Sequence, residues 1–197
     1  MAEYHLRTPI KEEDVRKLHV GDVIYITGTV ITARDAAHRR AVEYYEKGLK
    51  IPVEFEGNVL YHCGPVVKKV DDKWVFVSAG PTTSTRMEYI EPKFIEYFKP
   101  RVIIGKGGLG DKTLEALGKY GAVYATFPGG LGVIAATSVK EVKRVEWIDL
   151  GTPEALWVLE VEEFGPSIVT MDTHGRSIHK DVSEQAKKQL EELLKKL

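Results

Sequence analysis

Cysteine is almost absent from this 197-residue chain, in which Cys63 is the sole example. One cysteine cannot form a disulfide within the chain. It also cannot supply an iron–sulfur or zinc site from the thiolates of this chain alone, because such sites need several cysteine ligands. We therefore expect no disulfide and no metal-ligand set here, and we expect Cys63 to be a buried core thiol.

Long hydrophobic runs and an excess of one charge are also missing. No stretch approaches the roughly 18 consecutive apolar residues of a membrane span, and the first residues contain no apolar signal region. The 28 basic and 29 acidic residues leave a formal net charge of -1, so nothing favours bulk attraction to nucleic acid or to a membrane surface. We expect a cytoplasmic protein that binds neither.

Amides are equally scarce, with Asn58, Gln185 and Gln189 as the only examples beside abundant lysine and glutamate. This depletion is typical of proteins from thermophiles. The composition, 43% hydrophobic and 29% charged, is that of an ordinary globular protein, and the length suits one domain with its own core. We expect a single domain over 1–197.

The hydrophobic pattern predicts strands that alternate with helices of moderate length. Strands are expected at 23–31 (one bent strand or two short ones, interrupted by Gly28), 58–63, 66–70, 73–78, 101–104, 122–126, 155–161 and 167–171. Helices are expected at 35–50, near 87–90 and 94–98, at 111–120, and as an amphipathic C-terminal helix at 182–197. Since 66–78 is a hairpin and 101–126 a β-α-β unit, the prediction is a layered α/β fold with a mixed sheet.

The first polar loop, Thr32-Ala33-Arg34-Asp35-Ala36-Ala37-His38-Arg39, directly follows a predicted strand. Asp35 is placed to cap the next helix, with His38 in its first turn. Arg34 stands just before the helix, where its planar fork suits a carboxylate or phosphate. The alternative is a capping aspartate between solvated arginines.

The second loop, Gly80-Pro81-Thr82-Thr83-Ser84-Thr85-Arg86-Met87, has four consecutive hydroxyl residues followed by an arginine. Such a run suits a nest of donors for an anion. A helix N-cap with spare hydroxyls is the alternative, but one cap needs only one hydroxyl. The run therefore favours a functional role.

The third loop, Gly105-Lys106-Gly107-Gly108-Leu109-Gly110, matches GxGxxG between a strand and a helix. The next strand, however, ends in Ala125-Thr126-Phe127-Pro128, without the acidic residue that a dinucleotide site needs. A glycine-rich anion pocket with Lys106 as its charge remains, and a nicotinamide-dependent oxidoreductase is kept as an alternative. A fourth loop, Phe127-Pro128-Gly129-Gly130, is expected to be a tight turn.

Arg34, Arg86 and Lys106 are thus three cations in separate strand-end loops of a nearly neutral chain. If the loops converge, two arginine forks and a lysine suit a dicarboxylate or a phosphoester. The hydroxyl of Thr82 would donate a hydrogen bond, or accept a proton if nearby cations or a metal activated it.

Six spaced motifs resemble the β subunit, or C-terminal domain, of class I fumarate hydratases and L(+)-tartrate dehydratases. The resemblance runs in order from about residue 9 to residue 179. The motifs are Gly21-Asp22-Val23-Ile24-Tyr25, the Thr32–Arg39 loop, Tyr61-His62-Cys63-Gly64-Pro65, the Gly80–Met87 loop, Gly105-Lys106-Gly107-Gly108 and Phe127-Pro128-Gly129-Gly130.

The resemblance implies a swivelling β/β/α domain that pairs with a separate α subunit, in an α2β2 assembly. In the family, three cysteines of the α subunit hold an oxygen-sensitive [4Fe–4S] cluster, one iron of which binds the substrate and acts as a Lewis acid. By position, Thr82 would be the base that takes the C3 proton of malate, and the substrate carboxylates would be bound by Arg34, Arg86 and Lys106. Supporting roles fall to Asp35, His38, Thr83, Gly105 and Gly107.

The implied reaction is a hydro-lyase reaction, the reversible trans addition of water to fumarate to give (S)-malate. Within the family, dehydration of L(+)-tartrate to oxaloacetate is the alternative, and the motifs do not separate the two. A non-catalytic binding or regulatory module is a third alternative.

Overall fold

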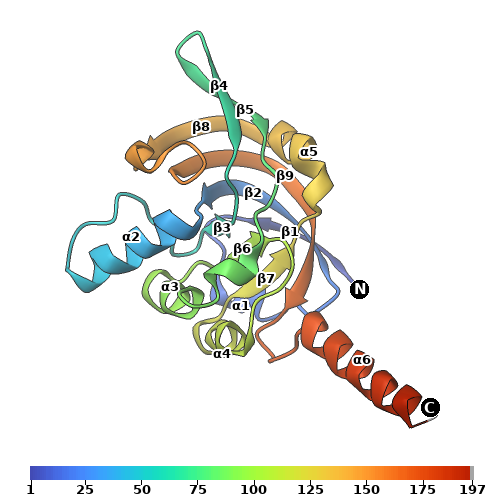
Figure 1. The fold of residues 1–197 in the computed structure, drawn as a ribbon. Coiled ribbons are helices and arrows are strands. Elements are labelled where there is room, and N and C mark those ends of the chain that lie inside the picture. Colours follow the sequence, from blue (N-terminus) through green and yellow to red (C-terminus); the bar gives the residue numbers. More distant parts are fainter. Residues whose placement is uncertain (196–197) are drawn as a thin grey trace.

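A mixed sheet forms the centre of the computed structural model, which describes residues 1–195 (Figure 1). Its strands, in spatial order, are β1 (Glu3–Arg7), β2 (Val23–Thr32), β3 (Val59–Tyr61), β6 (Val102–Gly105), β7 (Val123–Thr126), β9 (Leu156–Met171) and β8 (Val139–Glu146). Because β2 pairs with β9 as well as with β3, the sheet closes on itself through β2, β3, β6, β7 and β9.

Strand direction accounts for the mixed character of the sheet. The pairs β1–β2, β2–β3, β3–β6 and β6–β7 are parallel, and β9 runs antiparallel to β2, β7 and β8. The parallel pair β6–β7 is joined by helix α4 (Asp111–Tyr120), which confirms the predicted β-α-β unit. The predicted hairpin is also confirmed, as β4 (Val66–Val70) and β5 (Lys73–Ser78).

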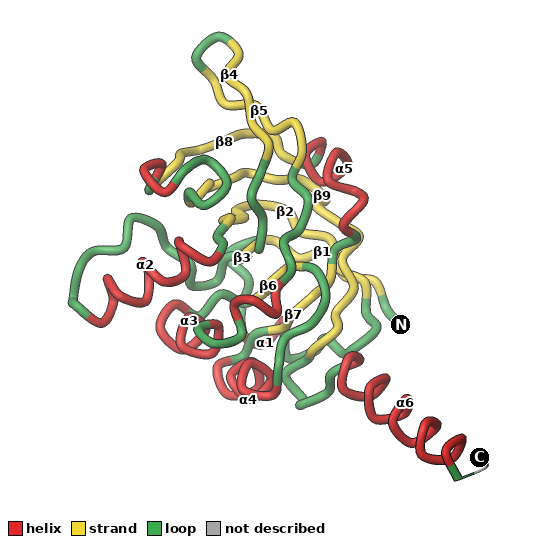
Figure 2. The backbone as a smooth tube through the Cα atoms, viewed as in Figure 1, coloured by secondary structure: helices red, strands yellow, loops and turns green. Residues whose placement is uncertain are grey.

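Helices cover one face of the closed sheet. Figure 2 shows α2 (Asp35–Glu46), α3 (Glu91–Phe98) and α4 together on that side, whereas the β4–β5 hairpin projects from the opposite end. The remaining helices are α1 (Glu12–Val15), α5 (Gly132–Thr137) and α6 (Ile178–Leu194), with 3-10 turns at Ser84–Met87, Gly129–Leu131 and Ile148–Leu150. None of these helices is both long and apolar enough to cross a membrane.

Alternate residues of the same strands feed two separate cores, as expected for a sheet buried on both faces. Tyr61 and Ile104 point into the closed sheet, where they join Trp157. Their neighbours Leu60 and Ile103 point the other way, against the helices. Two β layers around one core and a helical layer over the second give the predicted β/β/α arrangement.

The lone cysteine belongs to the inner core. Cys63 is fully buried and free, and burial raises the pKa of its thiol well above the usual value. The prediction of a core thiol is confirmed.

Strand β2 is a single strand that bends at Gly28. This residue has a φ of +114°, and any side chain there would overlap Thr8. The register between β2 and β9 shifts on either side of Ile26, so the bend is accommodated by bulges.

Several sequence-based boundaries are wrong. The expected strands 155–161 and 167–171 are one strand, β9, because a register shift near Phe164 accommodates Gly165-Pro166 without ending the ladder. Helix α2 ends at Glu46 rather than at residue 50, since Gly48 adopts a left-handed φ of +66°. The C-terminal helix begins at Ile178, and residues 196–197 of the predicted span lie outside the described residues.

Three elements were not predicted at all, namely β1, β8 and α5. Both strands lie at the edges of the sheet order, and β8 carries Lys140, Glu141, Lys143 and Arg144. Charged side chains protect an edge from pairing with other chains, and they also hide the apolar period of a strand.

Phe164 tests the inner core. Its ring lies 5.0 Å from that of Tyr61 and stacks on Phe127 at 5.3 Å. Phe164→Ala should lower the free energy of unfolding by about 3–5 kcal/mol in urea titrations, because it leaves a cavity. Val133→Ala, at a side chain that is 65% exposed, should change it by less than about 0.5 kcal/mol. Equal effects would contradict this packing.

Cys63 offers a second test of the same core. In the folded chain it should react with a thiol reagent at least about 100-fold more slowly than in urea, because a buried thiol is neither accessible nor ionised. The measurement is the rate of thiol labelling with and without urea. A native rate equal to the unfolded one would place Cys63 at the surface.

Candidate active site

The loops expected to carry chemistry meet at the carboxyl ends of the parallel strands. Backbone hydrogen bonds continue past the strand ends, from Ala33 N to Tyr61 O (3.0 Å), from His62 N to Ile104 O (2.8 Å) and from Phe127 N to Gly105 O (2.9 Å). Parallel strands end at the same edge, and ligands of open α/β sheets bind there. The structure therefore brings the first, third and fourth loops side by side.

The hydroxyl loop is inserted between the ends of β3 and β6. Thr82 donates its amide proton to His62 O (2.6 Å), and Lys106 N donates to Thr82 O (3.2 Å). Ser84 N in turn donates to Lys106 O (3.0 Å), and the exposed Thr83 pairs with Lys106 as a short parallel bridge. Thr82, which is half-buried, is thus fixed beside the backbone of Lys106.

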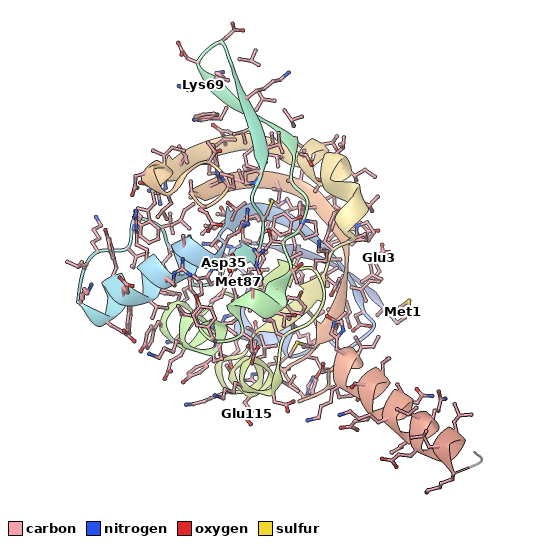
Figure 3. The ribbon with its side chains drawn as sticks, viewed as in Figure 1. Met1, Glu3, Asp35, Lys69, Met87 and Glu115 are labelled. Atoms are coloured by element: carbon pink, nitrogen blue, oxygen red, sulfur yellow. The ribbon has the colours of Figure 1, made fainter. Side chains whose placement is uncertain are left out.

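Asp35 does not cap helix α2, contrary to the prediction. Arg34 occupies the N-cap position, and no side chain makes a capping hydrogen bond. The Asp35 carboxylate accepts a hydrogen bond from Arg86 Nη2 at 2.8 Å instead. Figure 3 labels Asp35 at the start of α2, close to Met87. This charge-assisted bond joins the first loop to the second.

Arg34 is also held by a carboxylate. Its Nε lies 3.3 Å from Glu154 Oε1, and the other oxygen of Glu154 accepts a hydrogen bond from Ala36 N (2.8 Å). Gly64 allows this placement, since a Cβ there would overlap the arginine side chain. Arg34 is therefore not a solvated arginine. No sequence signal identified Glu154, which lies in a turn before β9.

Lys106 completes the set of cations. Its side chain is exposed, and its stem passes over Gly129, where a Cβ would lie 3.1 Å from Lys106 Cδ. The two glycines that flank Lys106 have steric reasons to be there. A side chain at Gly105 would overlap the hydroxyl of Ser84, and Gly107 has a φ of +75°.

The N-terminus of α4, which the GxGxxG match offered to a phosphate, is occupied by a side chain. Glu88 Oε2 accepts hydrogen bonds from Gly110 N (2.6 Å) and from Thr113 Oγ1 (2.7 Å). A carboxylate at this position takes the place that a pyrophosphate would need. The dinucleotide interpretation therefore loses its anion site.

A buried cluster of His38, His62 and Glu91 lies beneath these loops. All three side chains are fully buried, and Glu91 Oε2 lies 3.2 Å from His38 Nε2 and 3.3 Å from His62 Nε2. His38 was expected to order the first loop, and its Nδ1 does donate a hydrogen bond to Arg34 O (2.8 Å).

His62 and Glu91 were missed by the sequence reasoning. Glu91 lies on the buried face of α3, together with Phe94, Ile95 and Phe98. An acidic residue at the helical spacing of these apolar residues was the sequence feature that could have identified it. His62 appeared only as part of the Tyr61–Pro65 motif, and nothing in the sequence placed it against Glu91.

Charge in this cluster follows from its surroundings. Burial by itself disfavours an ionised Glu91, but the adjacent imidazoles of His62 and His38 outweigh it and lower the pKa of the carboxyl to about 2. Burial also lowers the pKa of His62 below its usual value. One donor atom from each of the three lies within 4.8 Å of the others, so this group is also the candidate for a metal ion among residues 1–195.

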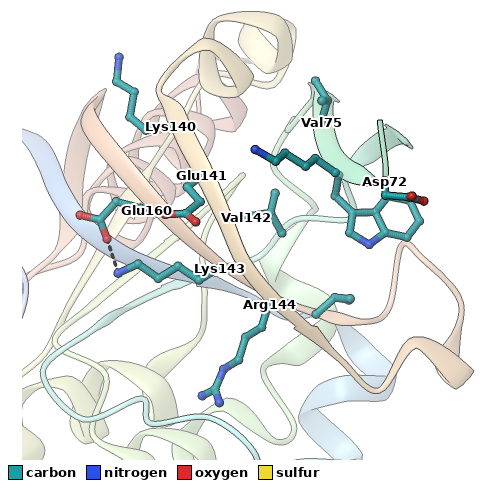
Figure 4. Close-up of a pocket in the computed structure, with 11 residues that line it drawn as sticks. Asp72, Val75, Lys140, Glu141, Val142, Lys143, Arg144 and Glu160 are labelled. Atoms are coloured by element: carbon teal, nitrogen blue, oxygen red, sulfur yellow. Dashed lines mark ion pairs between the residues drawn. The ribbon is translucent and has the colours of Figure 1, made fainter. Parts of the chain in front are cut away.

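A large cleft lies elsewhere. Figure 4 shows it between the β4–β5 hairpin and β8, with a volume of about 750 Å³ and an ion pair between Lys143 and Glu160. Its lining includes Trp74, Val75 and Val142 but none of the predicted site residues. Size alone therefore does not identify the active site in this chain.

Comparisons with known proteins agree with the motifs. A family model described as Fumarase C-terminus matches residues 1–182. The chain is 50% identical over 173 residues to "L(+)-tartrate dehydratase subunit beta" of Escherichia coli (strain K12), which covers 88% of this chain and 85% of that one.

Two further relatives extend the range of organisms. "Putative L(+)-tartrate dehydratase subunit beta" of Methanocaldococcus jannaschii is 45% identical over 94% of this chain and 95% of its own length. "Putative fumarate hydratase class I" of Geobacillus stearothermophilus is 40% identical over 94% of this chain, which corresponds to 35% of that longer protein. With a family model that spans most of its length and relatives at these identities, this chain belongs to the Fumarase C-terminus family.

Proposed function

We propose that this chain is the β subunit of a two-subunit hydro-lyase that reversibly hydrates fumarate to (S)-malate. The α subunit would be a separate chain, in an α2β2 assembly in the cytoplasm. The observation that carries the proposal is the meeting of the loops of Thr82, Arg86 and Lys106 at one edge of the sheet, through backbone hydrogen bonds and the Arg86–Asp35 pair.

The cations suit a substrate with two carboxylates. The guanidinium groups of Arg34 and Arg86 are each oriented by a carboxylate of this chain, and Lys106 is exposed beside Thr82. Oriented arginine forks recognise planar carboxylates by paired hydrogen bonds. Removal of the C3 proton of malate builds negative charge on the adjacent carboxylate, so these cations would stabilise the transition state more than the ground state.

Thr82 is proposed as the group that accepts the C3 proton. A hydroxyl is a weak base, and it needs positive charge nearby to hold the deprotonated form. Lys106 and Arg86 would supply that charge. The backbone hydrogen bonds of Thr82 with His62 and Lys106 fix the segment of backbone that carries the hydroxyl.

The iron–sulfur cluster of the family does not fit this chain. Cys63 is buried in the core and its thiol resists ionisation, so it cannot act as a ligand. We place the cluster in the partner subunit, where it would act as a Lewis acid on the substrate hydroxyl. This chain would bind the carboxylates, exclude water and move the proton.

Dehydration of L(+)-tartrate is the second candidate, and a specific observation favours it. The relatives named as L(+)-tartrate dehydratase subunits reach 50% and 45% identity, against 40% for the one named as a fumarate hydratase. Malate and L(+)-tartrate differ by one hydroxyl and share both carboxylates, so both would bind the same cations.

Removal of either reacting side chain should abolish turnover. In the complex reconstituted anaerobically with its α subunit, Thr82→Ala should lower kcat by at least about 100-fold, because the proton acceptor is lost. Arg86→Ala should lower kcat/KM by a similar factor, since it removes a carboxylate contact and leaves Asp35 unpaired. The loss of fumarate absorbance measures both.

Matched controls separate chemistry from folding. Thr137→Ala and Arg176→Ala remove the same side chains at exposed positions, and both should retain activity and circular dichroism. Near-normal turnover of Thr82→Ala or of Arg86→Ala would contradict the role proposed for that residue.

Substrate choice is tested by a side-by-side assay of the reconstituted enzyme with malate and with L-tartrate. The fumarate proposal predicts a kcat/KM for malate at least about 10-fold above that for L-tartrate, a difference of about 1.4 kcal/mol in transition-state binding. The reverse ratio would establish the second candidate. If the chain showed no activity with malate or with L-tartrate, even when combined with a cluster-bearing partner, a non-catalytic module would be the remaining interpretation.

A further inference from the structure

We propose that His38, His62 and Glu91 form a closed structural site for a divalent transition metal ion, and that Zn²⁺ fits it best. The site would lie under the loops described above and would be separate from any cluster in a partner subunit. The proposal does not depend on the proposed function, because it rests on three side chains that touch no substrate.

The spacing of the donor atoms matches a tetrahedral ion. In a zinc site with Zn–N and Zn–O bonds of about 2.0–2.1 Å, neighbouring ligand atoms lie about 3.3 Å apart. Glu91 Oε2 lies 3.2 Å from one Nε2 atom and 3.3 Å from the other. All three donor atoms lie within 4.8 Å of one another, so an ion between them would bind all three after a shift of the imidazoles toward each other.

Hydrogen bonds do not account for the same atoms. Although Glu91 Oε2 lies within ion-pair distance of both Nε2 atoms, neither contact has hydrogen-bond geometry, and Glu91 Oε1 has no hydrogen-bond partner among residues 1–195. An ionised carboxylate buried without an aligned donor is costly, and buried charges are normally paired or bound to metal. A cation bound by both imidazoles and by Glu91 would satisfy these atoms.

The outer contacts are those of metal-binding histidines. His38 Nδ1 faces the carbonyl of Arg34, which can only accept, so Nδ1 carries a proton and Nε2 would be the ligand atom. His62 Nδ1 lies 2.8 Å from Ser84 Oγ, which also accepts a hydrogen bond from Tyr124. Fixing the far nitrogen in this way orients the ligand and sets its tautomer.

The site would be structural rather than catalytic. Two imidazole nitrogens and Glu91 are three protein ligands, and none of the three side chains is exposed. Because the cluster is sealed from solvent, a substrate could not reach the ion, whose fourth position would be filled by the second oxygen of Glu91 or by a buried water. The ion would link α2, the segment after β3, and α3.

Metal content of the full chain is the direct test. After expression with added zinc and dialysis, mass spectrometry of the wild-type protein should find about one zinc per chain. Glu91→Gln and His62→Gln should each reduce bound zinc at least about 10-fold. His174→Gln, at an exposed histidine that stacks on His19, should keep the wild-type content.

Two further measurements use the wild-type chain and do not depend on the folding of a variant. Cobalt substitution should give the intense visible absorption of a tetrahedral site, and a strong chelator should lower Tm by several degrees. The proposal would be overturned if the folded wild-type chain contained no zinc and if neither zinc nor a chelator changed its Tm. Glu91 would then be paired with a protonated His38 instead of a metal ion. Zinc retained by both ligand variants would overturn the placement.

Discussion

The carboxylate of Glu91 is fully buried, and its surroundings are arranged to stabilise its charge. Desolvation of such a charge costs several kcal/mol unless positive or polar groups lie within hydrogen-bonding distance. Here the compensating groups come from α2 and from the end of β3, at 3.2 and 3.3 Å. The start of α2, the end of β3 and the first turn of α3 are therefore held together by one electrostatic requirement.

The loops above inherit their positions from this cluster. His38 holds the carbonyl of Arg34, and the backbone of His62 accepts the amide proton of Thr82. Two arginines are in turn oriented by Glu154 and Asp35. Because these contacts already restrict the rotamers of Arg34 and Arg86, the two side chains would lose little conformational entropy on binding a substrate. Their pairing also explains how a chain of net charge -1 concentrates cations at one edge.

Local patterns predicted much of this arrangement, and long-range pairings were what they could not predict. The hairpin, the β-α-β unit and the loops of Thr82, Arg86 and Lys106 each leave a signature within a few residues. Asp35 was misjudged because an aspartate before a helix is normally a cap, and only the folded chain brings Arg86 to it. No local sequence pattern marks Glu154 as a partner of Arg34. In β8, the charged residues hide the alternation of apolar residues that would have predicted a strand.

The β4–β5 hairpin emerges between His62 and Thr82, and those two residues are joined by a hydrogen bond at its base. The segment between His62 and Thr82 is thus a loop closed by this hydrogen bond, and the length of its tip does not change the distance between the two residues. Loop-closure entropy grows only slowly with length. Evolution can consequently lengthen, shorten or rewrite the tip at Asp71-Asp72 to suit a changing neighbour, while the spacing of the two functional residues stays constant.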